Sequence, residues 1–194
     1  MSDETQQEGA RLIAAMATGD RRALGRLIAL HGRGLTLVAT RYLSREDEAE
    51  EIVQDTFLRA WRHAGRYDPA KAKVLTWLYR ITVNLCIDRQ RRNALRRFIG
   101  FEDVAKNGTF EVEDLQPTAE TRFGDQAQLA QVRAAIAGLP DRQRMALLLS
   151  AVGELDNPEI AEAMRSSRGA VEQLLVRARR TLRMTTGQDE DIRP

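Results

Sequence analysis

The sequence predicts an all-α protein made of two small helical domains, the second a helix-turn-helix module of four helices. Three observations carry this prediction. Apolar residues recur at intervals of three and four along most of the 194-residue chain. Strand-like alternation is scarce, and glycine and proline are few, at 13 and 5. An acidic stretch without sustained periodicity, residues 98–126, lies between the two periodic parts and is predicted to be a flexible linker.

Four helical stretches are expected in the first domain, residues 1–97. Asp20 and Ser44 are suited to cap the second and third helices, because a short side-chain oxygen accepts hydrogen bonds from the free N–H groups of a first turn. Gly65 should end the third helix, and a turn at 67–69 should lead into the fourth. The four stretches, caps included, cover residues 10–17, 20–43, 44–64 and about 71–96.

The second domain, residues 127–186, is expected to hold the remaining four helices, and residues 187–194 should form a disordered tail. Gly138 should end its first helix, and Asn157 and Ser167 can cap its last two. This part of the chain contains no aromatic residue. Its core is therefore expected to be small and aliphatic.

The formal net charge of +2 hides a segregation of charge along the chain. Residues 66–97 carry a net +7, residues 98–125 a net −5 and residues 126–186 a net +3. Such blocks predict separate partners for separate segments. Arginine outnumbers lysine by 27 to 3, which fits contact with phosphates and bases, but arginine-rich codon usage is the better explanation of the total.

Cysteine usage and hydropathy indicate where the protein acts. Cys86 is the only cysteine, so no intrachain disulfide can form and a reducing compartment is expected. No apolar run approaches the roughly 18 residues of a membrane span, and the acidic, polar N-terminus does not resemble a secretory signal. We therefore expect a cytoplasmic protein that is not inserted into a membrane.

The strongest local signal lies between Asn157 and Arg183. A short helix, a tight turn of small residues and a longer amphipathic helix predict a helix-turn-helix, whose last helix would enter the major groove of DNA. An ordinary helical hairpin with a solvated arginine face is the alternative. The residues that a DNA-reading face would present are Ser167, Arg168, Gly169, Glu172, Gln173, Arg177, Arg179 and Arg180.

A second signal, residues 75–97, interleaves aromatic and basic side chains. Arginines can follow the phosphates of single-stranded DNA while aromatic rings stack on its unpaired bases. A core tryptophan beside a solvated basic helix is an equally good interpretation of the same stretch. The candidate DNA-binding residues here are Trp77, Tyr79, Arg80, Asn84, Arg89, Arg91 and Arg92.

A third signal is the acidic run 46–55, which should be helical. A helix this acidic repels DNA, so a DNA-binding protein would use it to meet another protein. The alternative is a solvated helix whose acidic residues are favoured near its N-terminus.

Nothing in the sequence supports an enzyme. There is no glycine-rich loop to hold a phosphate and no arrangement of nucleophile and base. His31, His63 and Cys86 lie on separate segments and match no metal-ligand spacing. We expect no metal, no cofactor and no small-molecule substrate.

Together these segments resemble a bacterial extracytoplasmic-function (ECF) sigma factor of the sigma-70 family. The resemblance covers about residues 12–96 and 127–184. In the first domain it is carried by the runs DEAEEIVQDTFLRAWR, TWLYRITVN and IDR, and in the second by LPDRQR, EIAE, GAV and RAR. Each run alone is modestly specific, but all of them in this order are very specific.

The resemblance implies a protein that binds core RNA polymerase and directs it to a subset of promoters. The second signal would melt and read the −10 element, with Asn84 near a captured base, and the helix-turn-helix would read the −35 element. The linker would thread into the polymerase channel, and an anti-sigma factor would commonly hold such a protein inactive. The residues that would bind the clamp helices of the largest polymerase subunit are Glu50, Glu51, Gln54, Asp55 and Leu58.

Two positions of the recognition helix depart from the family pattern. Glu172 and Gln173 stand where a basic residue and a serine are typical, and the turn 164–167 lacks the usual glycine. Glu172 cannot donate to phosphate or guanine, although its carboxylate could accept from a cytosine amino group. Two rival functions stay open: a helix-turn-helix regulator that needs no polymerase, and a sigma-like mimic that never touches DNA.

Overall fold

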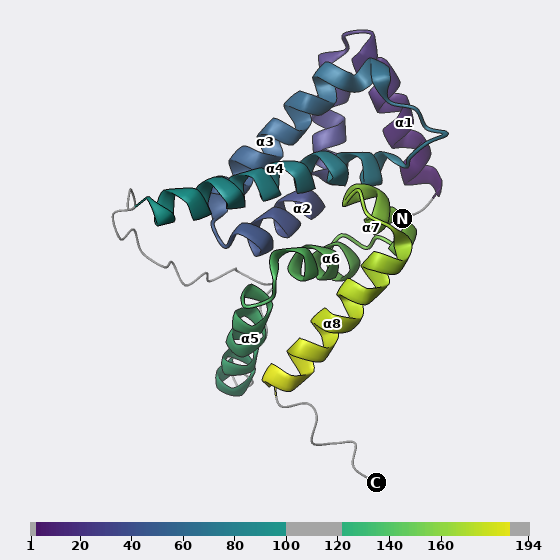
Figure 1. The fold of residues 1–194 in the computed structure, drawn as a ribbon. Coiled ribbons are helices and arrows are strands. Elements are labelled where there is room, and N and C mark those ends of the chain that lie inside the picture. The colour runs from purple at the N-terminus through teal and green to yellow at the C-terminus, as the bar shows by residue number, and fades with distance from the viewer. Residues whose placement is uncertain (1–2, 100–121, 187–194) are drawn as a thin grey trace.

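The computed structural model describes residues 3–99 and 122–186, and every regular element in these ranges is helical, which confirms the all-α prediction (Figure 1). The first domain comprises α1 (Asp3–Ala17), α2 (Arg21–Leu43), α3 (Glu46–His63), the short 3-10 helix η1 (Ala64–Arg66) and α4 (Val74–Phe98). The second comprises α5 (Arg122–Ala137), α6 (Asp141–Ala151), α7 (Asn157–Ala163) and α8 (Arg168–Thr186). Most of the expected linker and all of the expected tail lie outside the described residues.

Two of the predicted N-caps are confirmed, and a third is wrong. The Asp20 carboxylate accepts from the N–H of Arg22 at 2.8 Å, and the Ser167 hydroxyl caps α8 in the same manner. Ser44 instead ends α2: it takes a left-handed conformation with φ 56°, and its N–H donates to the carbonyl of Thr40. The αL residue that closes one helix cannot also provide the extended N-cap of the next.

The N-cap of α7 is Asp156, one residue before the predicted Asn157. The Asp156 carboxylate accepts from the N–H of Glu159 at 2.8 Å, and the Glu159 carboxylate accepts from the N–H of Asp156 at 3.0 Å. This reciprocal capping box satisfies two N–H groups of the first turn at once, which a cap at Asn157 would not do.

Several helix bounds differ from the expected ones. The first helix begins at Asp3 rather than residue 10. The third α-helix ends at His63, and Gly65, expected to end it, lies in the 3-10 helix η1 that follows. The fourth begins at Val74 because Asp68 holds the preceding residues in a turn, its carboxylate accepting from the N–H of Ala70 at 3.0 Å. The fifth begins at Arg122, within the segment expected to be linker.

The two domains pack against each other, which the sequence did not predict. α6 lies beside α2, and α7 lies beside the N-terminal half of α4 (Figure 1). Leu149 and Leu155 of the second domain belong to the same buried cluster as Leu35 and Leu78 of the first. A smaller cluster of Leu139, Leu147 and Ala178 lies within the second domain.

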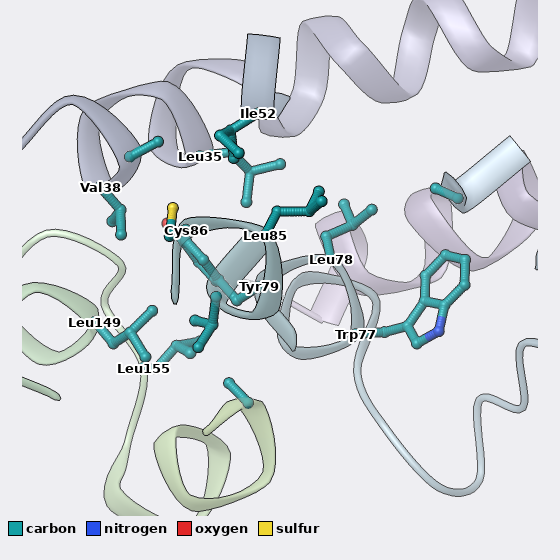
Figure 2. Packing of buried hydrophobic residues seen from close by; sticks show 14 of the residues in the cluster. Leu35, Val38, Ile52, Trp77, Leu78, Tyr79, Leu85, Cys86, Leu149 and Leu155 are labelled. Atoms are coloured by element: carbon teal, nitrogen blue, oxygen red, sulfur yellow. The ribbon is translucent and has the colours of Figure 1, made fainter. Parts of the chain in front are cut away.

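Tyr79 occupies the seam between the domains. It is 1% exposed, and Figure 2 shows it between Val38 of α2 on one side and Leu149 of α6 and Leu155 of the following segment on the other. A Cβ added at Gly153 would lie 3.2 Å from the Tyr79 ring, so only a glycine lets the chain approach so closely here. The second domain has no aromatic residue after Phe123, at the start of α5, and this ring of the first domain completes its aliphatic core.

The turn between α7 and α8, in which the sequence analysis noted the lack of a glycine, is closed by Arg165. The N–H of Ser166 donates to the carbonyl of Ala161 at 2.8 Å and that of Arg165 to Glu162 at 3.1 Å, the Schellman pattern. This pattern puts Arg165 in the left-handed region, at φ 49°.

Replacing Arg165 with glycine is therefore expected to raise the free energy of unfolding by about 0.5–1 kcal/mol. The relief of left-handed strain, about 1–2 kcal/mol, exceeds the entropic cost of a glycine, about 0.5–1 kcal/mol. Arg165→Ala keeps the strain and should give no gain. Urea denaturation of the two variants checks this, and a loss of stability in the glycine variant would contradict it.

Candidate nucleic-acid and protein interfaces

The acidic face of α3 is accessible. Its inward side buries Ala49, Ile52 and Phe57 against α2 and α4, which leaves the intervening positions in solvent. Leu58 is 48% exposed and gives this surface an apolar centre. Every residue predicted to bind the polymerase is on the exposed face of the helix, namely Glu50, Glu51, Gln54, Asp55 and Leu58.

A polar cluster joins α3 to α4 at the edge of this face. Arg89 contacts the carboxylate of Glu51 at 2.7 Å and that of Glu48 at 3.9 Å. The Asn93 amide donates to both oxygens of Glu48, at 2.9 and 3.2 Å. Arg89 and Glu51, predicted from sequence to meet different partners, are thus partners of each other in this structure.

Glu48 is 8% exposed, so removing its carboxylate should leave the Asn93 amide without its two acceptors and Arg89 with Glu51 as its remaining carboxylate partner. We expect Glu48→Ala to lower the free energy of unfolding by about 1–3 kcal/mol. Glu46→Ala removes an exposed acidic residue of the same helix that is not part of the cluster, and should change the free energy of unfolding by less than about 0.5 kcal/mol. Equal effects of the two substitutions in chemical denaturation would refute the structural role of Glu48.

The two aromatic residues predicted to stack on DNA are both buried. Trp77 is 7% exposed and packs against Tyr67, with ring centroids 5.1 Å apart. Tyr79 lies in the interdomain seam, where burial raises the pKa of its phenol well above the usual range. Thr76 to Tyr79 are four consecutive buried residues, because α2 and α3 cover one side of α4 and α7 covers another.

Two cations beside this seam are paired with carboxylates of α7. The Lys73 ammonium lies 2.9 Å from Glu159, and the Arg80 guanidinium lies 3.7 Å from Glu162. Arg144 joins α6 to α2 instead: its guanidinium lies over the ring of Tyr42 of α2 at 4.8 Å and donates to Asp141 of its own helix at 2.8 Å.

The C-terminal half of α4 remains open. Arg91 and Arg92 are exposed, and with Arg59 of α3 they line a shallow depression whose floor includes Leu85. Asn84 is half-buried on the same helix. The sequence analysis did not select Arg59, because only the packing of α3 on α4 places it beside the two arginines.

The helix-turn-helix forms as predicted, with α8 presenting a largely solvated outer face. Val171, Leu175 and Ala178 bury its inner side. Arg168 is hydrogen-bonded through Nε to the Glu172 carboxylate at 3.0 Å. The remaining residues predicted to read DNA are all exposed, namely Ser167, Gly169, Gln173, Arg177, Arg179 and Arg180.

Among the described residues no helix is long and apolar enough to cross a membrane. Nor do the described ranges contain a group of His, Cys, Asp and Glu side chains that could hold a metal ion.

Comparison with known proteins matches two family models to this chain, Sigma-70 region 2 over residues 27–96 and Sigma-70, region 4 over residues 129–182. The chain is 31% identical to the RNA polymerase sigma factor CnrH of Cupriavidus metallidurans, over 95% of this chain and 98% of CnrH. It is 32% identical to the ECF RNA polymerase sigma factor SigM of Mycobacterium tuberculosis, over 94% of this chain and 86% of SigM.

Two solved structures share the fold. The structure of CnrH in complex with the cytosolic domain of CnrY matches with a TM-score of 0.66 at 29% identity, over 95% of this chain and 99% of that one. The sigma factor RpoE in complex with the anti-sigma factor NepR from Bartonella quintana matches with a TM-score of 0.67 at 21% identity, over 87% and 98%.

An exposed helix-turn-helix and a basic helix on one chain are typical of a DNA-binding transcription factor, and the exposed acidic face of α3 is suited to a protein partner. The two family matches and the curated relatives make the assignment specific: the chain belongs to the sigma-70 family of RNA polymerase sigma factors, in its ECF branch. It binds core RNA polymerase and directs initiation at particular promoters.

Proposed function

We propose that this sigma factor is closed when free, and that core polymerase must separate its domains before it can read a promoter. The observation that carries the proposal is the packing of α7 on α4. In the open state α3 would bind the polymerase clamp, α4 would read and melt the −10 element, and α8 would read the −35 element. The chain would catalyse no reaction itself, since the polymerase forms the phosphodiester bonds. It would act in the cytoplasm.

Charge explains why the closed and promoter-bound states exclude each other. Glu159 and Glu162 lie on Lys73 and Arg80, in the positions that promoter phosphates would need. A cation that is neutralised by a carboxylate gains little from a phosphate, and the carboxylates themselves repel DNA. Tyr79 is covered by the second domain at Gly153, in the segment after α6, so its ring can reach an unpaired base only after that domain has moved.

Distance gives an independent reason. The −35 and −10 elements are about 25 base pairs apart, or about 85 Å along B-DNA. A compact chain of this length has a radius of gyration of only about 16 Å. The 22 residues of segment 100–121 could bridge up to roughly 75 Å at full extension, which permits the separation.

An anti-sigma factor is the proposed regulator. The related CnrH has been solved with the cytosolic domain of CnrY, and RpoE with the anti-sigma factor NepR. A protein that bound across the α4–α7 contact would stabilise the closed state by mass action and keep the chain from polymerase. Its absence from the native protein purified from unstressed cells would count against this part of the proposal.

In vitro transcription separates the proposed function from its rivals. Core polymerase with this chain should give discrete run-off products from a genomic promoter library, and core alone should not. The free chain should shift the same promoters weakly in gels without core. Tight, sequence-specific binding without core would favour the stand-alone regulator, and an absence of chain-dependent products would favour the mimic.

A further inference from the structure

The recognition helix α8 carries an ion pair in which the basic residue precedes the acidic one, the opposite of the sequence order that best stabilises a helix. Arg168 is the first residue of α8 and Glu172 lies one turn later. Positive charge is disfavoured at a helix N-terminus, and a pair with the basic residue first is the weaker orientation on a helix. Both side chains are largely in solvent, at 70% and 46% exposed. Helix stability therefore accounts poorly for this pair.

Electrostatics at the DNA surface also requires the two residues to act together. The N-terminal end of α8 is the part of a helix-turn-helix that enters the major groove. A bare carboxylate at Glu172 would be repelled by the phosphates on either side of that groove. The Arg168 guanidinium, bonded to it at 3.0 Å, supplies the compensating charge.

The geometry points to Arg168 and Glu172 as a single unit that reads guanine in the −35 element. Because Glu172 accepts from Nε of Arg168, the two Nη groups stay free at the other end of the guanidinium. That end can donate two parallel hydrogen bonds to O6 and N7 of guanine, and Glu172 fixes its direction. The inference rests on the proposed −35 role of α8 and adds to it which residues set the base preference.

Gln173 is also exposed and polar, but an amide has the geometry for a bidentate contact with adenine, so a guanine preference near the helix start falls to the Arg168–Glu172 unit. Gly169 and Ala170 have no functional group, and Val176, 59% exposed, can make only an apolar contact such as that with a thymine methyl. Arg179 is exposed further along the helix, where a phosphate contact would position the protein without specifying sequence.

The test is a promoter selection with reconstituted holoenzyme. A library with a randomised −35 region is transcribed by core polymerase with the wild-type chain, R168A, E172A, the double variant or R179A. We expect the wild type to prefer guanine at one position by about 10-fold or more. R168A should abolish that preference, and E172A should weaken it. R179A should lower the yield of all promoters about equally.

The double variant tests the coupling. R168A alone leaves an uncompensated carboxylate against DNA, so it should lose more total transcription than R168A/E172A, although the double variant should not regain the guanine preference. Replacing the preferred guanine with 7-deazaguanine, which lacks the N7 acceptor, should impair the wild type but not R168A. A guanine preference that survives both single substitutions overturns this inference alone. A wild type without any −35 preference overturns the proposed role of α8 as well.

Discussion

Replacing Tyr79 with alanine is expected to lower the free energy of unfolding by about 3–5 kcal/mol, the usual cost of removing a large buried ring. The side chain is 1% exposed and packs between α2 and the segment that follows α6 (Figure 2). Its loss would leave a cavity that the glycine-lined seam cannot fill. Chemical denaturation of the full chain measures the effect.

The phenylalanine variant separates packing from the hydroxyl. Tyr79→Phe keeps the ring and should lose no more than about 1 kcal/mol. If Tyr79 served only to stack on DNA, Tyr79→Ala would unfold like the wild type and fail only in promoter opening. That outcome would contradict the closed arrangement, because a ring free in solvent adds nothing to stability.

Reversing the charge of Asp55 is expected to weaken binding to core polymerase by roughly 30- to 100-fold. The residue lies in the middle of the exposed acidic face of α3, and a cation there would oppose the basic surface proposed to receive it. Placing like charges across an interface costs several kcal/mol, and the expected loss of affinity corresponds to about 2–3 kcal/mol of binding free energy. Titration of labelled core polymerase with the D55K variant measures the affinity.

A matched control lies on the same helix. Glu46 is also an exposed acidic residue of α3, but it lies about two and a half turns before Asp55 and about one turn before Glu50, the first residue of the proposed interface. E46K has the same change in net charge and should bind core polymerase within about 3-fold of the wild type, since distant surface charges are screened. Equal losses in D55K and E46K would mean that net charge, not this face of α3, governs the interaction.

Helices and their order could be predicted from sequence because they depend on local signals. The period of apolar residues gave every helix of the described ranges, and the caps at Asp20 and Ser167 followed from side-chain chemistry. Where two local signals competed, the prediction failed. Ser44 could begin one helix or end another, and Asp156 with Glu159 formed a capping box that Asn157 alone did not indicate.

Contacts between segments that are distant in the sequence could not be predicted from local signals. Trp77 and Tyr79 stand among arginines, and that pattern is typical both of a DNA-binding stretch and of a buried helix with a charged edge. Only the packing of the second domain, at Leu149, Gly153 and Leu155, shows that Tyr79 is covered. Likewise, Glu51 and Arg89 are 38 residues apart, so their ion pair depends on how α3 packs on α4.

The roles of individual residues toward polymerase and promoter remain predictions from the family resemblance. The structure shows which of these residues are accessible in the free chain. The acidic face of α3 and the outer face of α8 are open in the free chain, whereas Lys73, Tyr79 and Arg80 are engaged by the second domain. We therefore expect polymerase binding to come before reading of the −10 element.

The distance between the two domains, measured with and without core polymerase, tests this order most directly. Labels on cysteines introduced at Arg62 of α3 and Arg183 of α8, both exposed, report the separation. Cys86 should not interfere, because burial raises the pKa of its thiol to about 12. The free chain should give one short distance, and core polymerase should lengthen it by roughly 30 Å or more, as the spacing of the promoter elements requires. An unchanged distance on core binding would contradict the account.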